Sequence, residues 1–294
     1  MTARPSPAAA LDGSASHLPL LPFGTRLRAA MDARGPLCVG IDPHASLLEA
    51  WGLGDDVAGL ERFSRTVVEA LGAEAAVVKP QAAFFERFGS KGVAVLEQTV
   101  ADARAAGALV LMDAKRGDIG STMAAYADAF LSPTSPLFSD AVTVSPFLGF
   151  GSLRPAFDAA RASGAGVFVL AHTSNPEGHE VQHAVGEDGL TVAQSILRRL
   201  AAENADAYPL GSFGAVVGAT LRTVDADLDI NGPLLAPGVG AQGATPADIP
   251  KLFGPAAENV LPSVSRAVLK HGPSVGALRE ASARFVDETR KAIG

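Results

Sequence analysis

The chain has 294 residues and a formal net charge of −7, with 24 Lys and Arg against 31 Asp and Glu, which argues against a nucleic-acid-binding function. Hydrophobic residues make up 48% of the sequence and charged residues 19%, so we expect a compact core rather than a disordered chain. The single cysteine, Cys38, excludes an internal disulfide, and no apolar run reaches the ~18 residues of a membrane span, so we expect a cytoplasmic protein with no membrane partner.

Short apolar runs recur along the chain after an N-terminal segment rich in Ala, Ser and Pro. We predict that residues 1–20 are a flexible, poorly ordered segment and that residues 21–294 form one catalytic domain. Most of the apolar runs are continuous rather than alternating, which is typical of parallel strands buried on both faces. In chain order they cover residues 37–41, 75–78, 108–112, 141–144, 167–171, 215–217 and 234–236, with a weaker eighth run at 259–264.

The segments between most of these runs favour helices, because Ala, Leu, Glu and Arg recur in them at helical spacing. Examples are residues 60–71, 92–106, 153–162 and 191–202. Seven or eight β/α units in a chain of this length match a (β/α)₈ barrel, which needs about 250 residues plus insertions. A doubly wound open sheet is the alternative, but it usually carries a G-x-G-x-x-G turn after its first strand. Because the glycine-rich turn comes late in this chain, the sequence predicts an α/β protein with a single TIM barrel.

Charged residues gather where the predicted strands end, and the carboxyl ends of barrel strands share one rim. Asp113 and Lys115 are two residues apart in the segment DAKRGDI and face the same side of an extended chain. Lys79 follows the neighbouring strand, and Gly117 permits a turn that brings Asp118 round or sends it toward a neighbouring subunit. Isolated buried charges are strongly disfavoured, so these groups are expected to pair. The pattern indicates either charge-based catalysis or a structural ion-pair network at the barrel mouth.

The late glycine-rich turn, PGVGAQG at 237–243, predicts a phosphate site together with Arg266. Backbone N–H groups around Gly238 and Gly240 can surround phosphate oxygens, and an arginine supplies a bidentate clamp. Barrels often bind phosphate with the loops after strands 7 and 8. By itself the turn could be a plain strand-to-helix connection, so the pairing with Arg266 is what favours phosphate.

Six ordered segments between residues 37 and 267 resemble the orotidine 5′-phosphate decarboxylase family in its longer, type 2 form. The D-x-K-x-x-D-I core alone is shared with sister decarboxylases and aldolases on the same barrel, whereas all the segments together are specific. The resemblance implies a cofactor-free and metal-free carboxy-lyase that converts orotidine 5′-phosphate to UMP, the last step of de novo pyrimidine biosynthesis. The segments are GIDPH (40–44), VVKPQAAFFE (77–86), MDAKRGDIGSTM (112–123), VTVSPFLG (142–149), HTSNPEG (172–178) and APGVGAQG (236–243).

The resemblance also implies how four charged residues act. Lys79, Asp113, Lys115 and Asp118 match the charged catalytic tetrad of the family. Lys115 matches the proton donor. Asp118 is expected to reach the site of the second subunit of a homodimer.

Substrate contacts are implied in the same way. Asp42 matches a contact to the ribose hydroxyls, Thr122 a polar contact from the partner subunit, and Ser174 a contact to the pyrimidine amide. Gln242 and Arg266 match the phosphate grip. Of two unusually long connections, 131–138 and 175–189, the second matches the lid that closes over the ligand.

Two other functions are weaker alternatives. A Mg²⁺-dependent sugar-phosphate decarboxylase or synthase of the same barrel superfamily carries a Glu at the end of strand 2, where this chain has Lys79. A catalytically silent nucleotide-binding or scaffolding barrel is expected to lack at least one tetrad residue, and all four are present. Neither the histidines at 179 and 183 nor Cys38, which lies in a predicted strand, is expected to bind metal. His172 either contacts ligand or is a packed, hydrogen-bonded histidine.

Overall fold

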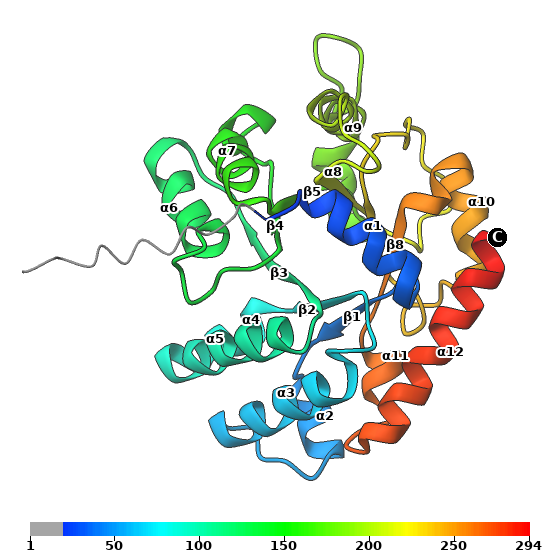
Figure 1. The fold of residues 1–294 in the computed structure, drawn as a ribbon. Coiled ribbons are helices and arrows are strands. Elements are labelled where there is room, and N and C mark those ends of the chain that lie inside the picture. The colour runs from blue at the N-terminus through cyan, green and yellow to red at the C-terminus, as the bar shows by residue number, and fades with distance from the viewer. Residues whose placement is uncertain (1–19) are drawn as a thin grey trace, which may run out of the picture.

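Eight parallel strands form a closed barrel in the computed structural model, which describes residues 20–294 (Figure 1). Each strand pairs with its neighbours in sequence, and β8 closes the barrel on β1. All eight predicted strands are present, so the predicted TIM barrel is confirmed. The predicted flexible segment lies outside the described residues, apart from residue 20. The strands are β1 (Cys38–Ile41), β2 (Val77–Pro80), β3 (Leu109–Arg116), β4 (Ala141–Val144), β5 (Gly166–His172), β6 (Phe213–Val217), β7 (Leu234–Pro237) and β8 (Val260–Val264).

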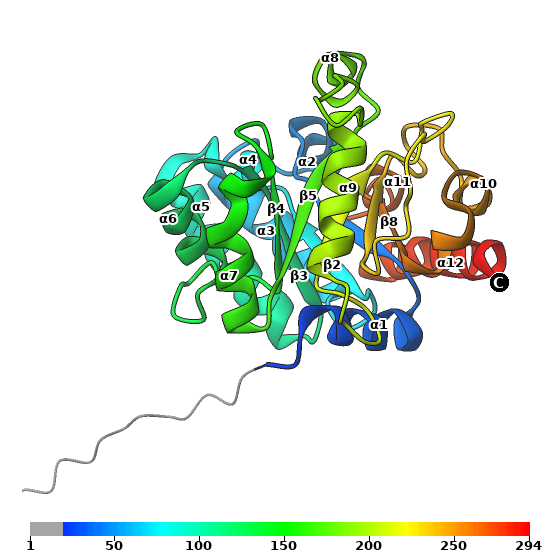
Figure 2. The same ribbon diagram turned by 90° about the horizontal axis from the view of Figure 1, so that it is seen from above.

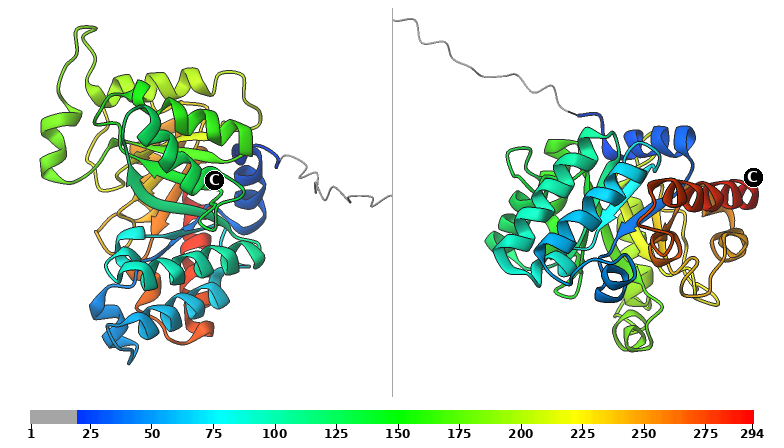
Figure 3. Two further views of the ribbon diagram at one scale, coloured as in Figure 1. Left: turned by 90° about the vertical axis from the view of Figure 1, so that its left-hand side faces the viewer. Right: turned by 90° about the horizontal axis from the view of Figure 1, so that it is seen from below.

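Helices cover the outside of the barrel, and α3 packs between α5 and α12 (Figures 1 and 3). The four predicted helices are confirmed to within a few residues as α3 (Val57–Leu71), α5 (Gly89–Ala105), α7 (Arg154–Ser163) and α9 (Val192–Glu203). None of the helices within 20–294 is long and apolar enough to cross a bilayer. The others are α1 (Phe23–Arg34), α2 (Ala45–Ala50), α4 (Ala82–Glu86), α6 (Gly120–Leu131), α8 (His179–Gln182), α10 (Ile249–Phe253), α11 (Arg266–Leu269) and α12 (Val275–Ile293), with short 3₁₀ turns η1 (Phe150–Leu153), η2 (Pro176–Gly178), η3 (Pro246–Asp248) and η4 (Gly254–Asn259).

Helix α1, which the sequence analysis did not predict, closes the amino end of the barrel. Its buried residues Phe23, Leu27 and Met31 join the side chains that fill the barrel interior. The ring of Phe23 meets the ring of Phe168 from β5 edge-on, with centroids 5.9 Å apart. Cys38 lies in the same cluster, where burial raises the pKa of its thiol to about 12, so it is an unreactive core residue. Access to the barrel is therefore from the other end.

The long connections lie at opposite ends of the barrel. Figure 2 shows α1 at one end and α8, which belongs to the connection 175–189, projecting from the other. The connection 131–138 leads from α6 into β4, so it lies at the amino ends of the strands. Residues 218–233, between β6 and β7, contain no helix, which breaks the β/α repeat. Of the two predicted long connections, only 175–189 lies on the carboxyl rim.

Candidate active site

A cavity of about 400 Å³ opens at the carboxyl ends of the strands, and all eight strands or the loops after them contribute to its wall. The predicted rim therefore exists. Seven of the predicted site residues line this cavity: Asp42, Lys79, Asp113, Lys115, Gly238, Gln242 and Arg266.

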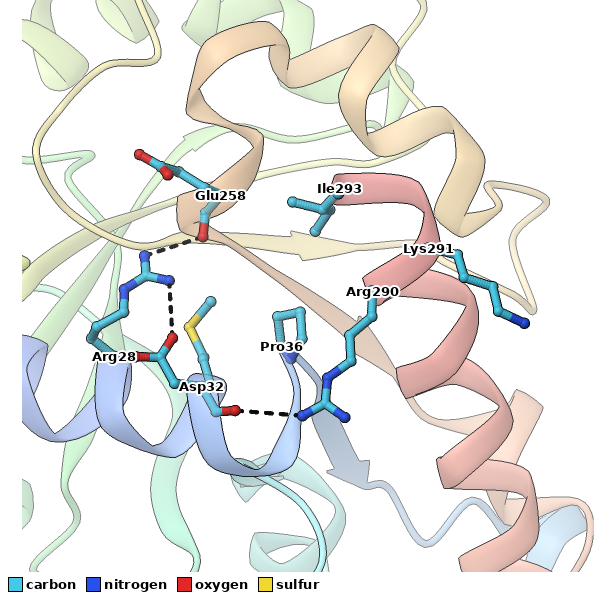
Figure 4. A pocket seen from close by; sticks show the side chains of 9 residues that line it. Arg28, Asp32, Pro36, Glu258, Arg290, Lys291 and Ile293 are labelled. Carbon is cyan, nitrogen blue, oxygen red and sulfur yellow. Dashed lines mark hydrogen bonds and ion pairs between the residues drawn. The ribbon is translucent and has the colours of Figure 1, made fainter.

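A larger cavity of about 740 Å³ lies at the amino end of the barrel, between α1 and α12 (Figure 4). Arg28, one of the charged residues in its wall, already has partners within the chain. Arg28 donates to the Glu258 carbonyl at 3.1 Å and lies 3.8 Å from the Asp32 carboxylate. No predicted site residue lines it, so its size does not make it the catalytic site.

Asp113 is the centre of a hydrogen-bonded network in the smaller cavity. Its Oδ2 accepts from Lys79 Nζ at 2.7 Å and from Gln81 Nε2 at 2.9 Å. Its Oδ1 accepts from Lys115 Nζ at 2.6 Å and from Thr143 Oγ1 at 2.9 Å. Asp113 and Lys79 are each only 6% exposed, whereas the Lys115 side chain is 46% exposed. The carboxylate is thus held between two ammonium groups, one of which can reach a ligand.

This pairing keeps the buried groups charged at neutral pH. Burial by itself disfavours the Asp113 carboxylate, but Lys79 and Lys115 outweigh it and hold the pKa of Asp113 well below its usual range. Burial also disfavours the Lys79 ammonium, but the carboxylates of Asp113 and Asp42 outweigh it and raise the pKa of Lys79 above its usual range. The cavity therefore presents fixed charges of alternating sign.

The backbone of β3 is irregular where it presents Lys115. The pairing of β3 with β4 shifts register between Met112 and Arg116. Lys115 has φ 48°, a left-handed conformation that residues with side chains rarely adopt, and its N–H donates to Thr143 Oγ1 at 3.0 Å. Such strain persists only where the surroundings hold it, and it concentrates at functional sites.

Gln81 and Thr143 are site residues that the sequence analysis missed. Thr143 lies between the buried Val142 and Val144 in a strand that is otherwise apolar, and this lone polar residue is the signal that could have found it. Gln81 directly follows β2, within the segment that contains Lys79.

Two polar atoms at the edge of the cavity are buried without a partner. Asp42 Oδ1 and Ser265 Oγ have no hydrogen-bond partner among the described residues. Buried polar atoms are nearly always paired, so this pair of acceptor and hydroxyl is available to a ligand. Asp42 was predicted to contact ribose, whereas Ser265 was not predicted.

The glycine-rich loop after β7 lies at the predicted phosphate end. Gly238 and Gly240 have φ 108° and 83°, which side chains disfavour. The N–H of Gly240 donates to the Ala244 carbonyl at 2.7 Å, and Gly240 does not line the cavity. Its role in this structure is to shape the loop. Arg266 makes no ion pair with any residue of 20–294, which leaves its guanidinium available to an anion.

Asp118, Thr122 and Ser174 do not line the cavity of their own chain. Asp118 Oδ1 accepts a hydrogen bond of 2.7 Å from the neighbouring Ile119 N–H, and Thr122 is exposed on α6. Ser174 is exposed as well, and its neighbour Thr173 lines the cavity instead.

The connection 175–189 is attached to the rim by two side chains. Gln182 bonds Thr173 twice, at 2.9 Å to its N–H and at 2.7 Å to its hydroxyl. His183 Nε2 lies 3.1 Å from His172 Nε2, and the ring of His179 stacks on His183 at 4.2 Å. His172 is therefore the packed, hydrogen-bonded histidine of the two possibilities. Within the described part of the chain, no group of three or more His, Cys, Asp or Glu is arranged to hold a metal ion.

Comparison with known proteins matches most of the chain. Residues 35–281 match the model of the orotidine 5′-phosphate decarboxylase / HUMPS family. Orotidine 5′-phosphate decarboxylase of Streptomyces coelicolor is 72% identical over 92% of this chain and 98% of its own length, and that of Nocardioides sp. is 64% identical over 92% and 100%.

Solved structures are similar over the same range. A crystal structure from Streptomyces avermitilis has a TM-score of 0.92 and 73% identity, covering 94% of this chain and 97% of its own. Leishmania donovani OMP decarboxylase has a TM-score of 0.72 and 28% identity over 93% and 99% of the two chains.

Proposed function

This chain belongs to the orotidine 5′-phosphate decarboxylase / HUMPS family and converts orotidine 5′-phosphate to UMP with release of CO₂, and we propose that Lys79, Asp113 and Lys115 carry out this step without a cofactor. The observation that carries the proposal is the network in which Asp113 is bonded to both lysines. The bond between C6 and the carboxylate breaks, its electron pair stays on C6, and Lys115 transfers a proton to that carbon.

The chemistry explains why fixed charges are needed. The electron pair left on C6 occupies an sp² orbital in the plane of the ring, where no π system delocalises it. An ammonium group held at C6 stabilises this charge as it develops and then donates its proton. A carboxylate beside the departing carboxylate repels it, by about 4 kcal/mol for unit charges ~4 Å apart at an effective dielectric of 20. Asp113 is in place for this role because four donors hold it.

The remaining cavity residues are proposed to hold the substrate. Asp42, with its unpaired buried oxygen, accepts from the ribose hydroxyls, while Gln242 and Arg266 bind the phosphate. Binding energy from the phosphate, which is remote from C6, closes the connection 175–189 over the ligand. In this closed state Ser174 contacts the pyrimidine amide.

We further propose a homodimer in which Asp118 and Thr122 enter the partner's site. The loops after β3 and β4 expose Ile119, Phe147 and Leu148, which are 62%, 75% and 52% exposed. Large apolar side chains that are exposed on the loops after two neighbouring strands indicate an interaction surface, and Ile119 is adjacent in sequence to Asp118. A second copy of the chain on this surface brings Asp118 to another active site. The predicted cytoplasmic location is part of the same proposal, supported by the single, buried cysteine.

The reaction is tested by incubating the purified protein with orotidine 5′-phosphate and EDTA and following its ultraviolet absorbance. Conversion to UMP under these conditions is expected and excludes the Mg²⁺-dependent alternative, for which Lys79 would repel the cation. A folded, dimeric sample that converts no substrate would contradict the proposed function.

Mixing two inactive variants tests the shared site. Lys115→Ala and Asp118→Ala remove residues that belong to the same site but to different subunits. After subunit exchange, about a quarter of the wild-type activity should return, because half of the dimers are mixed and each has one intact site. The absence of recovery in samples shown to form mixed dimers would contradict the role of Asp118.

A further inference from the structure

A third cavity, of about 560 Å³, adjoins the proposed phosphate site. It shares Ala241 and Arg266 with the wall of the catalytic cavity. Its other walls come from α2, from the residues after β8 and from the middle of α12. A ligand bound at Arg266 is therefore next to both cavities.

Positive charges outnumber negative ones in this third cavity. Arg266, Lys270 and Arg284 line it together with His271, and Glu288 is the one carboxylate among the lining residues. Within 20–294, none of the three cations Arg266, Lys270 and Arg284 has an ion-pair partner. Like charges that lie close together repel one another, and these three positive charges lie together in a chain whose net charge is −7. A cluster of this kind indicates an anionic ligand.

We propose that this cavity is a subsite for the second and third phosphates of pyrimidine nucleoside 5′-diphosphates and triphosphates. The proposal rests on the proposed contacts of Gln242 and Arg266 with the first phosphate. With the nucleoside in the catalytic cavity, the further phosphates extend past Arg266 toward Lys270 and Arg284. Such a nucleotide competes with the substrate, so the products of phosphoryl transfer to UMP inhibit the enzyme that makes UMP.

Competitive inhibition by UMP, UDP and UTP, measured without divalent cations, tests the subsite. UDP and UTP should inhibit the wild-type protein more strongly than UMP does. Lys270→Gln and Arg284→Gln should each raise the inhibition constant of UDP by about tenfold and that of UMP by less than about twofold. The reason is that UDP, unlike UMP, has a second phosphate beside the lost cation. Glu288→Gln should strengthen UDP inhibition, because it removes the opposing carboxylate.

A matched control is Lys291→Gln. Lys291 lies on α12, as Arg284 does, but lines the amino-end cavity of Figure 4. It should change none of the three inhibition constants. The subsite is wrong if UDP binds no more tightly than UMP, or if the Lys270 and Arg284 variants weaken both nucleotides equally. If only the subsite is wrong, UMP should still inhibit the wild-type protein. If UMP does not inhibit the wild-type protein at all, the proposed contacts of Gln242 and Arg266 with the first phosphate are contradicted as well.

Discussion

Thr143 Oγ1 donates a hydrogen bond of 2.9 Å to Asp113 Oδ1 and accepts one of 3.0 Å from the backbone N–H of Lys115. One hydroxyl thus joins the carboxylate of Asp113, which we propose is catalytic, to the strained backbone that carries the proposed proton donor. Because Thr143 lies on β4 and the other two residues on β3, it also spans the register shift between these strands.

Thr143→Val should lower kcat by about ten- to a hundredfold with a smaller effect on KM, because Lys115 loses the partner that holds its position. Thr143→Ser keeps the hydroxyl and should retain most of the activity. Steady-state kinetics measures kcat and KM of both variants, and thermal unfolding checks that both are folded. Equal kcat values in the valine and serine variants would assign Thr143 to packing alone.

Lys115→Ala should lower kcat by about a hundredfold or more, since it removes the group proposed to protonate C6. Circular dichroism should show an unchanged fold, because the Lys115 side chain is 46% exposed. Lys91→Ala, which alters an exposed lysine on α5, is the control and should leave kcat unchanged. A Lys115→Ala variant that keeps more than about a tenth of wild-type kcat would show that another group supplies the proton.

Arg266→Ala should weaken UMP binding by about 1.5–3 kcal/mol, the scale of hydrogen bonds to charged groups. Uridine, which lacks the phosphate, should bind equally to the variant and the wild type. Isothermal titration with both ligands measures the difference, with Arg62→Ala on the outer face of α3 as the charge-matched control. An equal loss for uridine would mean that Arg266 does not act on the phosphate.

Stability should fall in mild acid because of His172. Burial and the neighbouring His183 and His179 lower the pKa of His172 below its usual 6.5. At this residue the unfolded chain therefore binds more protons than the folded one below pH 6.5. The contribution of neutral His172 to the free energy of unfolding is fully present above pH 6.5 and is lost as the pH falls through the lowered pKa.

Chemical unfolding of the wild type and of His172→Gln between pH 8 and about pH 5 measures this effect. The glutamine variant should show a shallower decrease in its free energy of unfolding. If the two proteins lose stability in parallel, the decrease comes from other groups.

The sequence alone predicted the eight strands, because strands buried on both faces are almost continuously apolar, as 167–171 is. It also predicted that Lys79, Asp113 and Lys115 meet, because parallel strands end at one rim and buried charges must pair. Helix α1 was missed because its burial depends on covering the open end of a barrel that only the other elements create.

The amino-acid sequence was enough to predict the barrel architecture, the family and the residue types at the rim. The contacts between atoms became visible only in the folded chain: Thr143 and Gln81 complete the network around Asp113, the Gly240 N–H is already bonded to Ala244, and Ser174 lies away from the cavity. Hydrophobic periodicity indicates which face of an element is buried. The contacts of polar atoms depend instead on the register and rotation of strands distant in sequence, and a shift such as that between β3 and β4 leaves no periodic trace.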